Sequence, residues 1–281
     1  MSRSESRYLR CEGREIHFTE WGAGQDETVV AWHGLARTGR DMDHVAAHLA
    51  QQGYRVICPD TVGRGLSQWS PDPAAEYCLD FYASLARSLA DQLDIDSCLW
   101  LGTSMGGAIG LRAAAGVMRG RIRRLLLNDI GPELGAAAVA RIRAYAGQPP
   151  AFATMAELEA FFRTVYEPYG KLEDAHWRLL TETSMRRLPD GRVTPHYDPK
   201  MVMQFEAHPG DYLQWGQWDA LDIPVLVMRG ESSDLLLPET AEAMRTRGPR
   251  AVVATIPGCG HAPALNTPAQ YALVERFFAG G

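Results

Sequence analysis

Short apolar runs alternate with amphipathic helical stretches along much of this chain of 281 residues. Residues 28–32, 97–101 and 124–128 are the kind of run that a strand buried on both faces should have. Between them lie segments with apolar residues at helical spacing, such as residues 79–93. This alternation is typical of a parallel sheet with helices on both faces, so the sequence predicts an α/β fold.

The strand pattern stops after Gly131-Pro132 and returns only at residues 225–228 and 251–256. The intervening residues are helical in pattern, rich in aromatic side chains and broken by prolines. A helical insertion into one α/β domain explains this change better than two sequential domains. We therefore expect a core made of residues 1–132 and 219–281, with residues 133–218 forming a helical cap.

Composition excludes several classes of protein. The net charge is −6 and no basic stripe is present, so we expect no nucleic-acid partner. The five cysteines are scattered without a C-x-x-C pair, which disfavours a disulfide framework and a zinc site. The polar N-terminus has no apolar signal region, and no apolar run is long enough to span a membrane. We expect a soluble cytoplasmic protein without metal, cofactor or membrane partner; its oligomeric state stays open.

The strongest local signal is the segment Gly102-Thr-Ser104-Met-Gly106, which lies between a predicted strand and a predicted helix. A sharp turn there needs small neighbours and places the serine above the carboxyl edge of the sheet. The N-terminus of the following helix favours negative charge that develops nearby. A glycine-rich corner that serves packing alone is the other interpretation. The correct strand and helix context favours Ser104 as a nucleophile.

A serine nucleophile needs a base, and His261 is the best placed of eight histidines. It follows the last predicted strand in a Gly/Pro loop, at the same sheet edge as Ser104. His44 and His48 have a spacing that can hold zinc, but neither the H-E-x-x-H glutamate nor a third ligand is nearby. We therefore predict that His261 accepts the Ser104 proton.

The third member must be a carboxylate that fixes the histidine tautomer. Asp234 follows the strand before that of His261, and we favour it for this role. Asp129 ends another predicted strand at the same edge, and Glu231 lies in the same loop as Asp234. Both remain alternatives.

Acyl transfer also needs donors for the oxyanion. The backbone N–H of Leu35, in the turn after the first buried strand, and that of Met105, at the start of the helix, are the predicted pair. His33 is interpreted as a structural brace of that turn. Arg37 is a candidate for holding a substrate carboxylate, although a solvated loop residue is the more ordinary interpretation.

The aromatic side chains of the predicted cap suggest an apolar substrate pocket. Three candidates for its lining are Phe162, Trp215 and Trp218. Aromatic residues at helical spacing are more often part of a cap's own core, so a medium-sized apolar or aromatic acyl group is only a working hypothesis.

Several of these segments together resemble the α/β-hydrolase superfamily, and the resemblance covers most of the chain. They are the His33-Gly34 turn, Pro59-Asp60 with Gly63–Ser67, the Gly102–Gly107 elbow, Asn128-Asp129, Arg229 to Asp234, and Gly260-His261. The resemblance implies an eight-stranded, mostly parallel sheet with a helical cap after the sixth strand. It also implies an acid after the seventh strand and a histidine after the eighth, which supports Asp234 and His261.

Within that superfamily, serine at position 104 disfavours the epoxide hydrolases and haloalkane dehalogenases, which use aspartate there. Thr103 and Ala262 depart from the pattern of carbon–carbon bond hydrolases, which commonly have Asn and Trp at those places. We predict a serine hydrolase that cleaves a small-molecule carboxylic ester or lactone without a cofactor. The alternatives are a carbon–carbon hydrolase of a vinylogous diketone and a non-enzymatic ligand-binding member of the fold.

Overall fold

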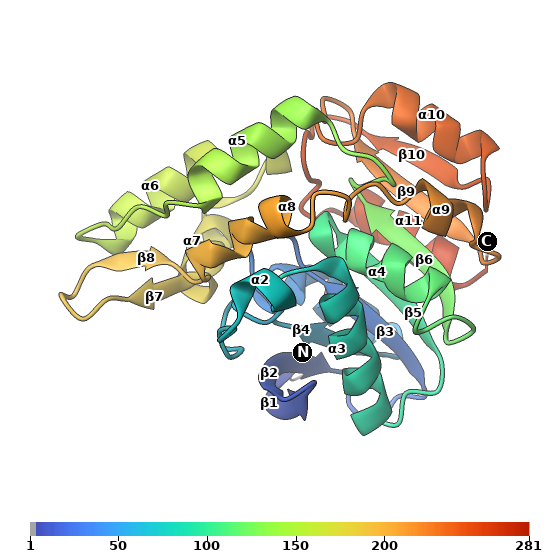
Figure 1. The fold of residues 1–281 in the computed structure, drawn as a ribbon, viewed down its shortest axis with the longest axis horizontal. Helices are drawn as coiled ribbons and strands as arrows, with labels where there is room; N and C mark the ends of the chain where they lie inside the picture. Colours follow the sequence, from blue (N-terminus) through green and yellow to red (C-terminus); the bar gives the residue numbers. More distant parts are fainter. Residues whose placement is uncertain (1–3, 281) are drawn as a thin grey trace.

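An eight-stranded sheet forms the centre of the computed structural model, which describes residues 4–280 (Figure 1). Residues 1–3 of the polar N-terminus considered above, and residue 281, lie outside the described part. The spatial order is β1-β2-β4-β3-β5-β6-β9-β10. The strands are β1 (Ser4–Cys11), β2 (Arg14–Trp21), β3 (Glu27–Trp32), β4 (Tyr54–Pro59), β5 (Cys98–Thr103), β6 (Ile122–Asn128), β9 (Val225–Gly230) and β10 (Val252–Ile256). β2 pairs antiparallel with β1 and β4, and the other neighbours are parallel. The α/β-hydrolase fold predicted from the sequence is confirmed.

The central strands are the apolar runs seen in the sequence, and their side chains are almost all buried. Strand β1 was not predicted. Its sequence, SESRYLRC, is mostly polar because the strand lies at the sheet edge with most side chains exposed. Pairing with β2, rather than burial, therefore holds this segment extended.

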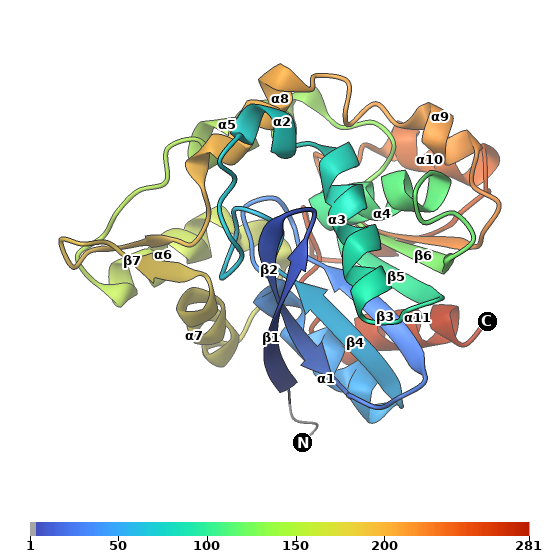
Figure 2. The same cartoon turned by 60° about the horizontal axis from the view of Figure 1, so that its bottom comes forward.

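Helices cover both faces of the sheet (Figure 2). The 3₁₀ turn η1 (Gly39–Met42) leads into α1 (Asp43–Gln51), which packs with α11 (Pro268–Phe278) on one face. On the other face lie α3 (Leu79–Gln92), α4 (Met105–Ala115) and α10 (Pro238–Thr246), and the short α2 (Pro73–Glu76) precedes α3. Each face has its own apolar cluster, as expected for strands buried on both sides. No helix within residues 4–280 is long and apolar enough to cross a membrane.

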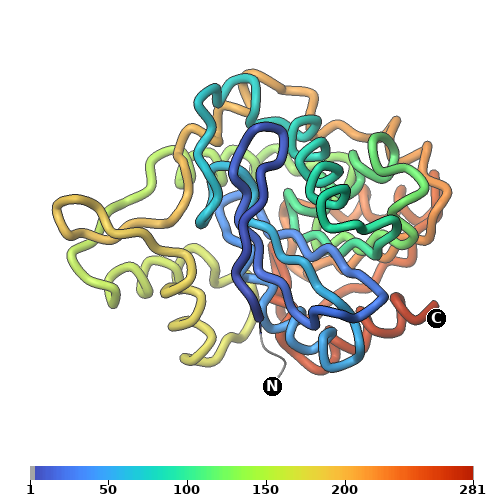
Figure 3. The backbone as a smooth tube through the Cα atoms, turned by 90° about the horizontal axis from the view of Figure 1, so that it is seen from below, coloured from blue at the N-terminus to red at the C-terminus, as the bar shows by residue number. Residues whose placement is uncertain are grey.

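The segment between β6 and β9 extends to one side of the sheet (Figure 3). It contains α5 (Ala136–Ala146), α6 (Met155–Val165), η2 (Glu167–Tyr169), α7 (Asp174–Thr183), a hairpin of β7 (Met185–Arg187) and β8 (Val193–Pro195), η3 (Pro199–Met203), α8 (Gln204–Ala207) and α9 (Trp215–Asp219). The hairpin forms a separate two-stranded sheet.

Two parts of this insertion pack differently. Leu158, Phe162 and Trp177 belong to a small apolar cluster of the insertion itself. By contrast, Ala138 of α5 and Trp218 of α9 join the large cluster under the main sheet. The division into a core and a cap at residues 133 and 218 stays a prediction, and the packing of α9 links the end of the insertion to the core.

Candidate active site

Ser104 stands at a sharp turn between β5 and α4. Its φ of +52° is unusual for a residue with a side chain. The turn requires glycines on both sides, because a Cβ on Gly102 would overlap the backbone of Gly106, and a Cβ on Gly106 would overlap the carbonyl of Trp32. The Ser104 N–H donates to Asn128 O at 2.9 Å and ties the turn to β6. The local sequence thus lifts the serine hydroxyl above the sheet edge.

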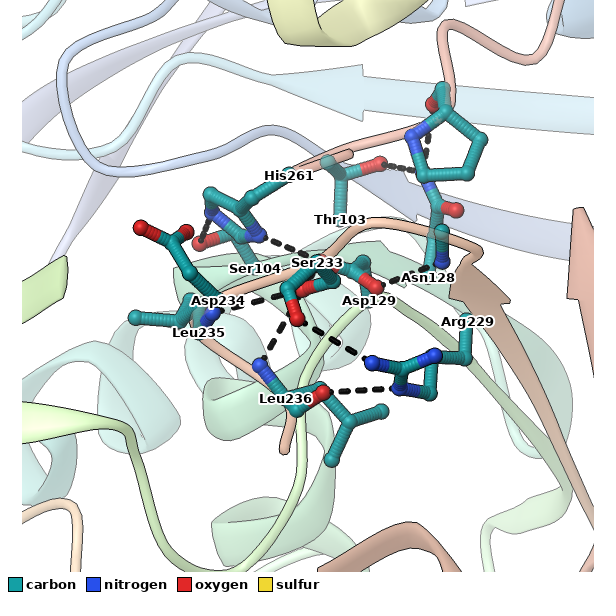
Figure 4. A network of polar contacts seen from close by, with 12 residues as sticks. Thr103, Ser104, Asn128, Asp129, Arg229, Ser233, Asp234, Leu235, Leu236 and His261 are labelled. Atoms are coloured by element: carbon teal, nitrogen blue, oxygen red, sulfur yellow. Dashed lines mark hydrogen bonds and ion pairs between the residues drawn. The ribbon is translucent and has the colours of Figure 1, made fainter. Parts of the chain in front are cut away.

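Ser104 and His261 are in hydrogen-bond contact, although they are far apart in sequence (Figure 4). Ser104 Oγ lies 2.9 Å from His261 Nε2, and His261 Nδ1 lies 2.7 Å from Asp129 Oδ2. A carboxylate can only accept, so the proton on this ring belongs on Nδ1 and leaves Nε2 free to accept from the serine. The order of groups is that of a nucleophile, a base and a carboxylate that orients the base.

Asp129 is fully buried at the end of β6, and its φ of +55° turns it away from the strand direction. Its carboxylate accepts the Gly230 N–H at 2.8 Å and the Ser233 hydroxyl at 2.6 Å, besides His261. Three donors offset the cost of burying a charged carboxylate. Asp129 is therefore a fixed acceptor for the histidine.

Asp234, the acid favoured from the sequence, is not in contact with His261. Its half-exposed carboxylate forms an ion pair with Arg141 of α5, with Arg141 Nη2 at 3.0 Å from Oδ1. This guanidinium lowers the pKa of the Asp234 carboxyl below its usual value. The structure thus corrects the prediction: Asp129, one of the two alternatives, occupies the position next to His261.

The path of the loop after β9 explains the correction. Arg229 donates to the backbone carbonyls of Leu236 and Ser233 at 2.8 and 3.1 Å, which folds the loop back on itself. This fold turns the Ser233 side chain toward Asp129 and leaves the next residue, Asp234, on the outside. Glu231, the third candidate, accepts from the Gly258 N–H at the surface instead.

The predicted oxyanion donors come from the two turns that flank Ser104. The carbonyl of Gly34 accepts from His33 Nδ1 at 2.6 Å, which fixes the orientation of the peptide that carries the Leu35 N–H. Arg64, fully buried, donates to the Leu35 carbonyl at 3.0 Å. Neither the Leu35 nor the Met105 N–H donates to another group among residues 4–280. Both amides are therefore available to a ligand, and their role as an oxyanion hole stays a prediction.

The contacts of His33 are those of a residue that braces the turn. It is fully buried, and its Nε2 accepts the Thr61 N–H at 2.9 Å. Burial lowers its pKa to about 4, so the ring is neutral at pH 7. A neutral ring with both nitrogens engaged is a scaffold for the turn rather than a second base.

A cavity that is partly open to solvent borders Ser104 and His261. Leu35 and Arg37 of the first turn line it, together with side chains of α5, α6 and η2 from the insertion. Arg37 is not the solvated loop residue considered above: it is 3% exposed and pairs with Asp41, with Nε 2.6 Å from Oδ2.

The other three predicted pocket residues are not among the described residues that line this cavity. Phe162 is fully buried in the insertion's own apolar cluster. The guanidinium carbon of Arg247 lies 4.1 Å from the centre of the Trp215 ring. Trp218 is buried in the core, and its indole N–H donates to the carbonyl of Arg247. Aromatic spacing alone does not tell a cavity wall from a packed interior, so a role of these three residues in substrate binding stays a prediction that this lining does not support.

The remaining histidines make other contacts. His44 and His48 of α1 point to different partners: His44 packs against the ring of His176, and His48 pairs with Glu275 at 2.6 Å. Among residues 4–280, no three His, Cys, Asp or Glu side chains gather as metal ligands would.

Comparisons with known proteins agree with this architecture. A model of the alpha/beta hydrolase family matches residues 29–273. The chain is 40% identical over 273 residues to a 3-hydroxybutyrate-oligomer hydrolase of Cupriavidus necator, which covers 94% of this chain and 92% of that protein. It is 39% identical over 113 residues to a 2-hydroxy-6-oxononadienedioate/2-hydroxy-6-oxononatrienedioate hydrolase of Escherichia coli, over 36% of this chain and 37% of that protein. An alpha/beta hydrolase structure from Novosphingobium aromaticivorans superposes with a TM-score of 0.87 at 32% identity, covering 99% of both chains.

Proposed function

Because the chain belongs to the alpha/beta hydrolase family, we propose that it hydrolyses carboxylic esters through an acyl-enzyme on Ser104, with short 3-hydroxyacid oligomers as the substrate class. The observation that carries this proposal is the continuous contact from Ser104 through His261 to Asp129. The match over nearly the whole length to an ester-cleaving hydrolase supports the substrate class.

In the first half of the reaction, Ser104 Oγ attacks the ester carbonyl while His261 Nε2 takes the serine proton. Asp129 keeps the proton of His261 on Nδ1 and stabilises the imidazolium that forms. The amides of Leu35 and Met105 hold the tetrahedral oxyanion, and the loss of one such donor typically costs roughly 10²–10³ in rate. His261 then gives its proton to the alcohol oxygen, which leaves.

In the second half, a water molecule replaces the alcohol. His261 Nε2 takes a proton from this water, whose oxygen attacks the acyl carbon of the ester on Ser104. Collapse of the second tetrahedral intermediate returns the proton to Ser104 Oγ and releases the carboxylic acid. The same three side chains act in both halves, and the substrate and one water molecule supply all the atoms of the products.

Carbon–carbon bond cleavage of a vinylogous diketone is the second candidate. The 39% identity to the Escherichia coli hydrolase favours it, but that match covers about a third of either chain. Ester and ketone substrates given side by side distinguish the two chemistries.

The test is turnover by the purified protein on dimers and trimers of 3-hydroxybutyrate, p-nitrophenyl esters of increasing length, a lactone and one dienol ketone. We expect the oligomers to have the highest kcat/KM and Ser104→Ala to lose turnover on all esters. Full turnover by Ser104→Ala would contradict the proposal, and faster cleavage of the ketone would favour the second candidate.

A further inference from the structure

The wall of the cavity beside Ser104 carries positive charge and no carboxylate. Its lining includes Arg37 and Arg141 but no Asp or Glu among the described residues. The carboxylate partners of these two arginines, Asp41 and Asp234, lie outside the lining. The lining thus contains two cationic side chains whose carboxylate partners are not part of it.

Arg37 supplies a buried and incompletely paired cation. Its Nη2 contacts Asp41 Oδ1 and Ser184 Oγ, each at 2.7 Å, and the guanidinium carbon lies 4.5 Å from the centre of the Tyr166 ring. Its Nη1 is buried without a hydrogen-bond partner in residues 4–280. These contacts join the core to the insertion, so Arg37 both fixes the cavity wall and adds charge to it.

Tyrosine hydroxyls supply neutral donors on the same wall. Tyr145 of α5 and Tyr169 of η2 line the cavity, and neither hydroxyl has a hydrogen-bond partner among the described residues. Burial raises the pKa of both phenols, so they stay protonated and can donate. A neutral phenol next to a guanidinium can donate a hydrogen bond to an anion that the guanidinium attracts.

Arg141 is the second cationic residue of the cavity lining, and it lies near the protein surface. It lies on α5, lines the cavity and is about half exposed, and its contact with Asp234 is at the protein surface. An exposed ion pair of this kind contributes little stability. Because its partner Asp234 is exposed to solvent, Arg141 can exchange this contact for a substrate carboxylate at a small cost in free energy.

We propose that Arg141, with the hydroxyls of Tyr145 and Tyr169 and the charge of Arg37, forms a subsite for a carboxylate of the substrate. This inference rests on the proposed ester hydrolysis and makes its substrate class narrower: esters of hydroxyacids whose far end is a free acid. In a 3-hydroxybutyrate dimer, that carboxylate belongs to the alcohol part, which leaves when Ser104 is acylated. The subsite therefore selects for cleavage next to a free acid terminus.

The experiment compares the 3-hydroxybutyrate dimer with its methyl ester, in which an uncharged ester replaces the terminal carboxylate, and follows cleavage of the internal ester bond that both substrates share. We expect the wild type to prefer the free acid by about tenfold to a hundredfold in kcat/KM, the range of one or two charge-assisted hydrogen bonds. Arg141→Gln should bring this ratio down to within about threefold of unity, mainly through KM. Tyr145→Phe should reduce the ratio by a smaller factor.

Asp234→Asn is the matched control, because it breaks the same surface ion pair from the side that does not face the cavity. We expect it to keep the preference for the free acid. If Arg141 only latched the insertion to the core through Asp234, both variants would lower turnover of both substrates and leave the ratio unchanged. That outcome, or equal kcat/KM of the wild type for acid and methyl ester, would overturn the subsite while ester hydrolysis stands.

Calorimetric binding to Ser104→Ala separates the subsite from the chemistry. We expect Ser104→Ala to bind the free-acid dimer at least tenfold more tightly than the methyl ester, and the addition of Arg141→Gln to remove the difference. Discrimination in binding without any hydrolysis by the wild type would support the subsite and contradict the proposed function. Absence of discrimination in binding would overturn the subsite.

Discussion

Within residues 4–280, two Ser–His–Asp arrays have nearly the same contacts. In the candidate active site, Ser104 Oγ is 2.9 Å from His261 Nε2, and His261 Nδ1 is 2.7 Å from Asp129 Oδ2. At the other array, Ser6 Oγ is 2.7 Å from His17 Nε2, and His17 Nδ1 is 2.7 Å from Asp60 Oδ2. Side-chain types and distances alone do not distinguish them.

The backbone around each serine does distinguish them. Ser104 stands at a positive-φ turn before α4. The unpaired N–H of Met105 is on the next residue, and Leu35, whose N–H is also unpaired, lines the same cavity as Ser104. Ser6 lies in strand β1, opposite Thr19 in an antiparallel ladder. An extended strand offers no convergent pair of N–H donors for an oxyanion.

The two aspartates also differ in what they hold. Besides its histidine, Asp129 accepts from Gly230 and Ser233, at the end of β9 and in the loop after it, whereas Asp60 accepts the N–H groups of Gly39 at 2.6 Å and Leu66 at 2.9 Å in two separate turns. Asp60 therefore organises two turns of the core. Under the proposed function, the comparison teaches that a carboxylate–histidine–serine contact serves hydrolysis only where the backbone also supplies oxyanion donors.

The largest expected effect comes from Asp129→Asn. It keeps the shape of the side chain but removes the charge that fixes the His261 tautomer, so kcat on an ester should fall by about 10³–10⁴. Steady-state kinetics of the folded variant measure it. A fall of less than tenfold would show that Asp129 does not act on His261 as proposed.

Asp60→Asn should act on stability instead. It removes the charge from a buried pair with His17 and weakens two backbone contacts, so the free energy of unfolding should drop by about 3 kcal/mol. Urea unfolding measures the drop, and kcat of the folded variant should stay within about threefold of wild type. A loss of activity as large as that of Asp129→Asn would break the distinction between the two arrays.

His33 sharpens the comparison through pH. Its folded pKa is about 4, below the ordinary 6.5, because burial disfavours the charged ring. Between pH 6.5 and 4 the unfolded chain takes up a proton that the folded chain does not, so stability falls on acidification by up to about 3 kcal/mol. Unfolding free energies at several pH values measure this slope, which should be smaller in His33→Gln. An equal slope in both proteins would show that His33 does not contribute.

Ser6→Ala should have the smallest effect. Ser6 is an exposed strand residue, so its loss should change the free energy of unfolding by less than about 0.5 kcal/mol and leave kcat unaltered. Thermal unfolding and ester kinetics check both expectations. A hundredfold fall in kcat would instead make this serine a participant in catalysis.

Local patterns predicted most of the fold and singled out two side chains that the structure places in contact, Ser104 and His261. The strand–turn–helix around Ser104 was recognisable because strand burial, glycines and helix spacing are all local properties of the sequence. His261 followed from its place after the last strand. Strand β1 escaped notice because an exposed edge strand has no apolar pattern.

The choice between Asp129 and Asp234 could not be predicted in the same way. It depends on how Arg229 folds the loop after β9, which is a tertiary contact. The cavity wall is a similar case: Phe162 and Trp218 looked suitable, yet packing buried both, while Tyr145 and Tyr169 face the cavity.

The most direct measurement of the central claim is covalent labelling of the wild type with an alkyl fluorophosphonate, followed by peptide mass spectrometry. Such a reagent phosphonylates only a serine that is activated by its base. We predict one label, on the peptide that contains Ser104, with loss of ester hydrolysis in proportion to labelling and no modification at Ser6. A label on Ser6, or loss of activity with Ser104 unmodified, would contradict the account.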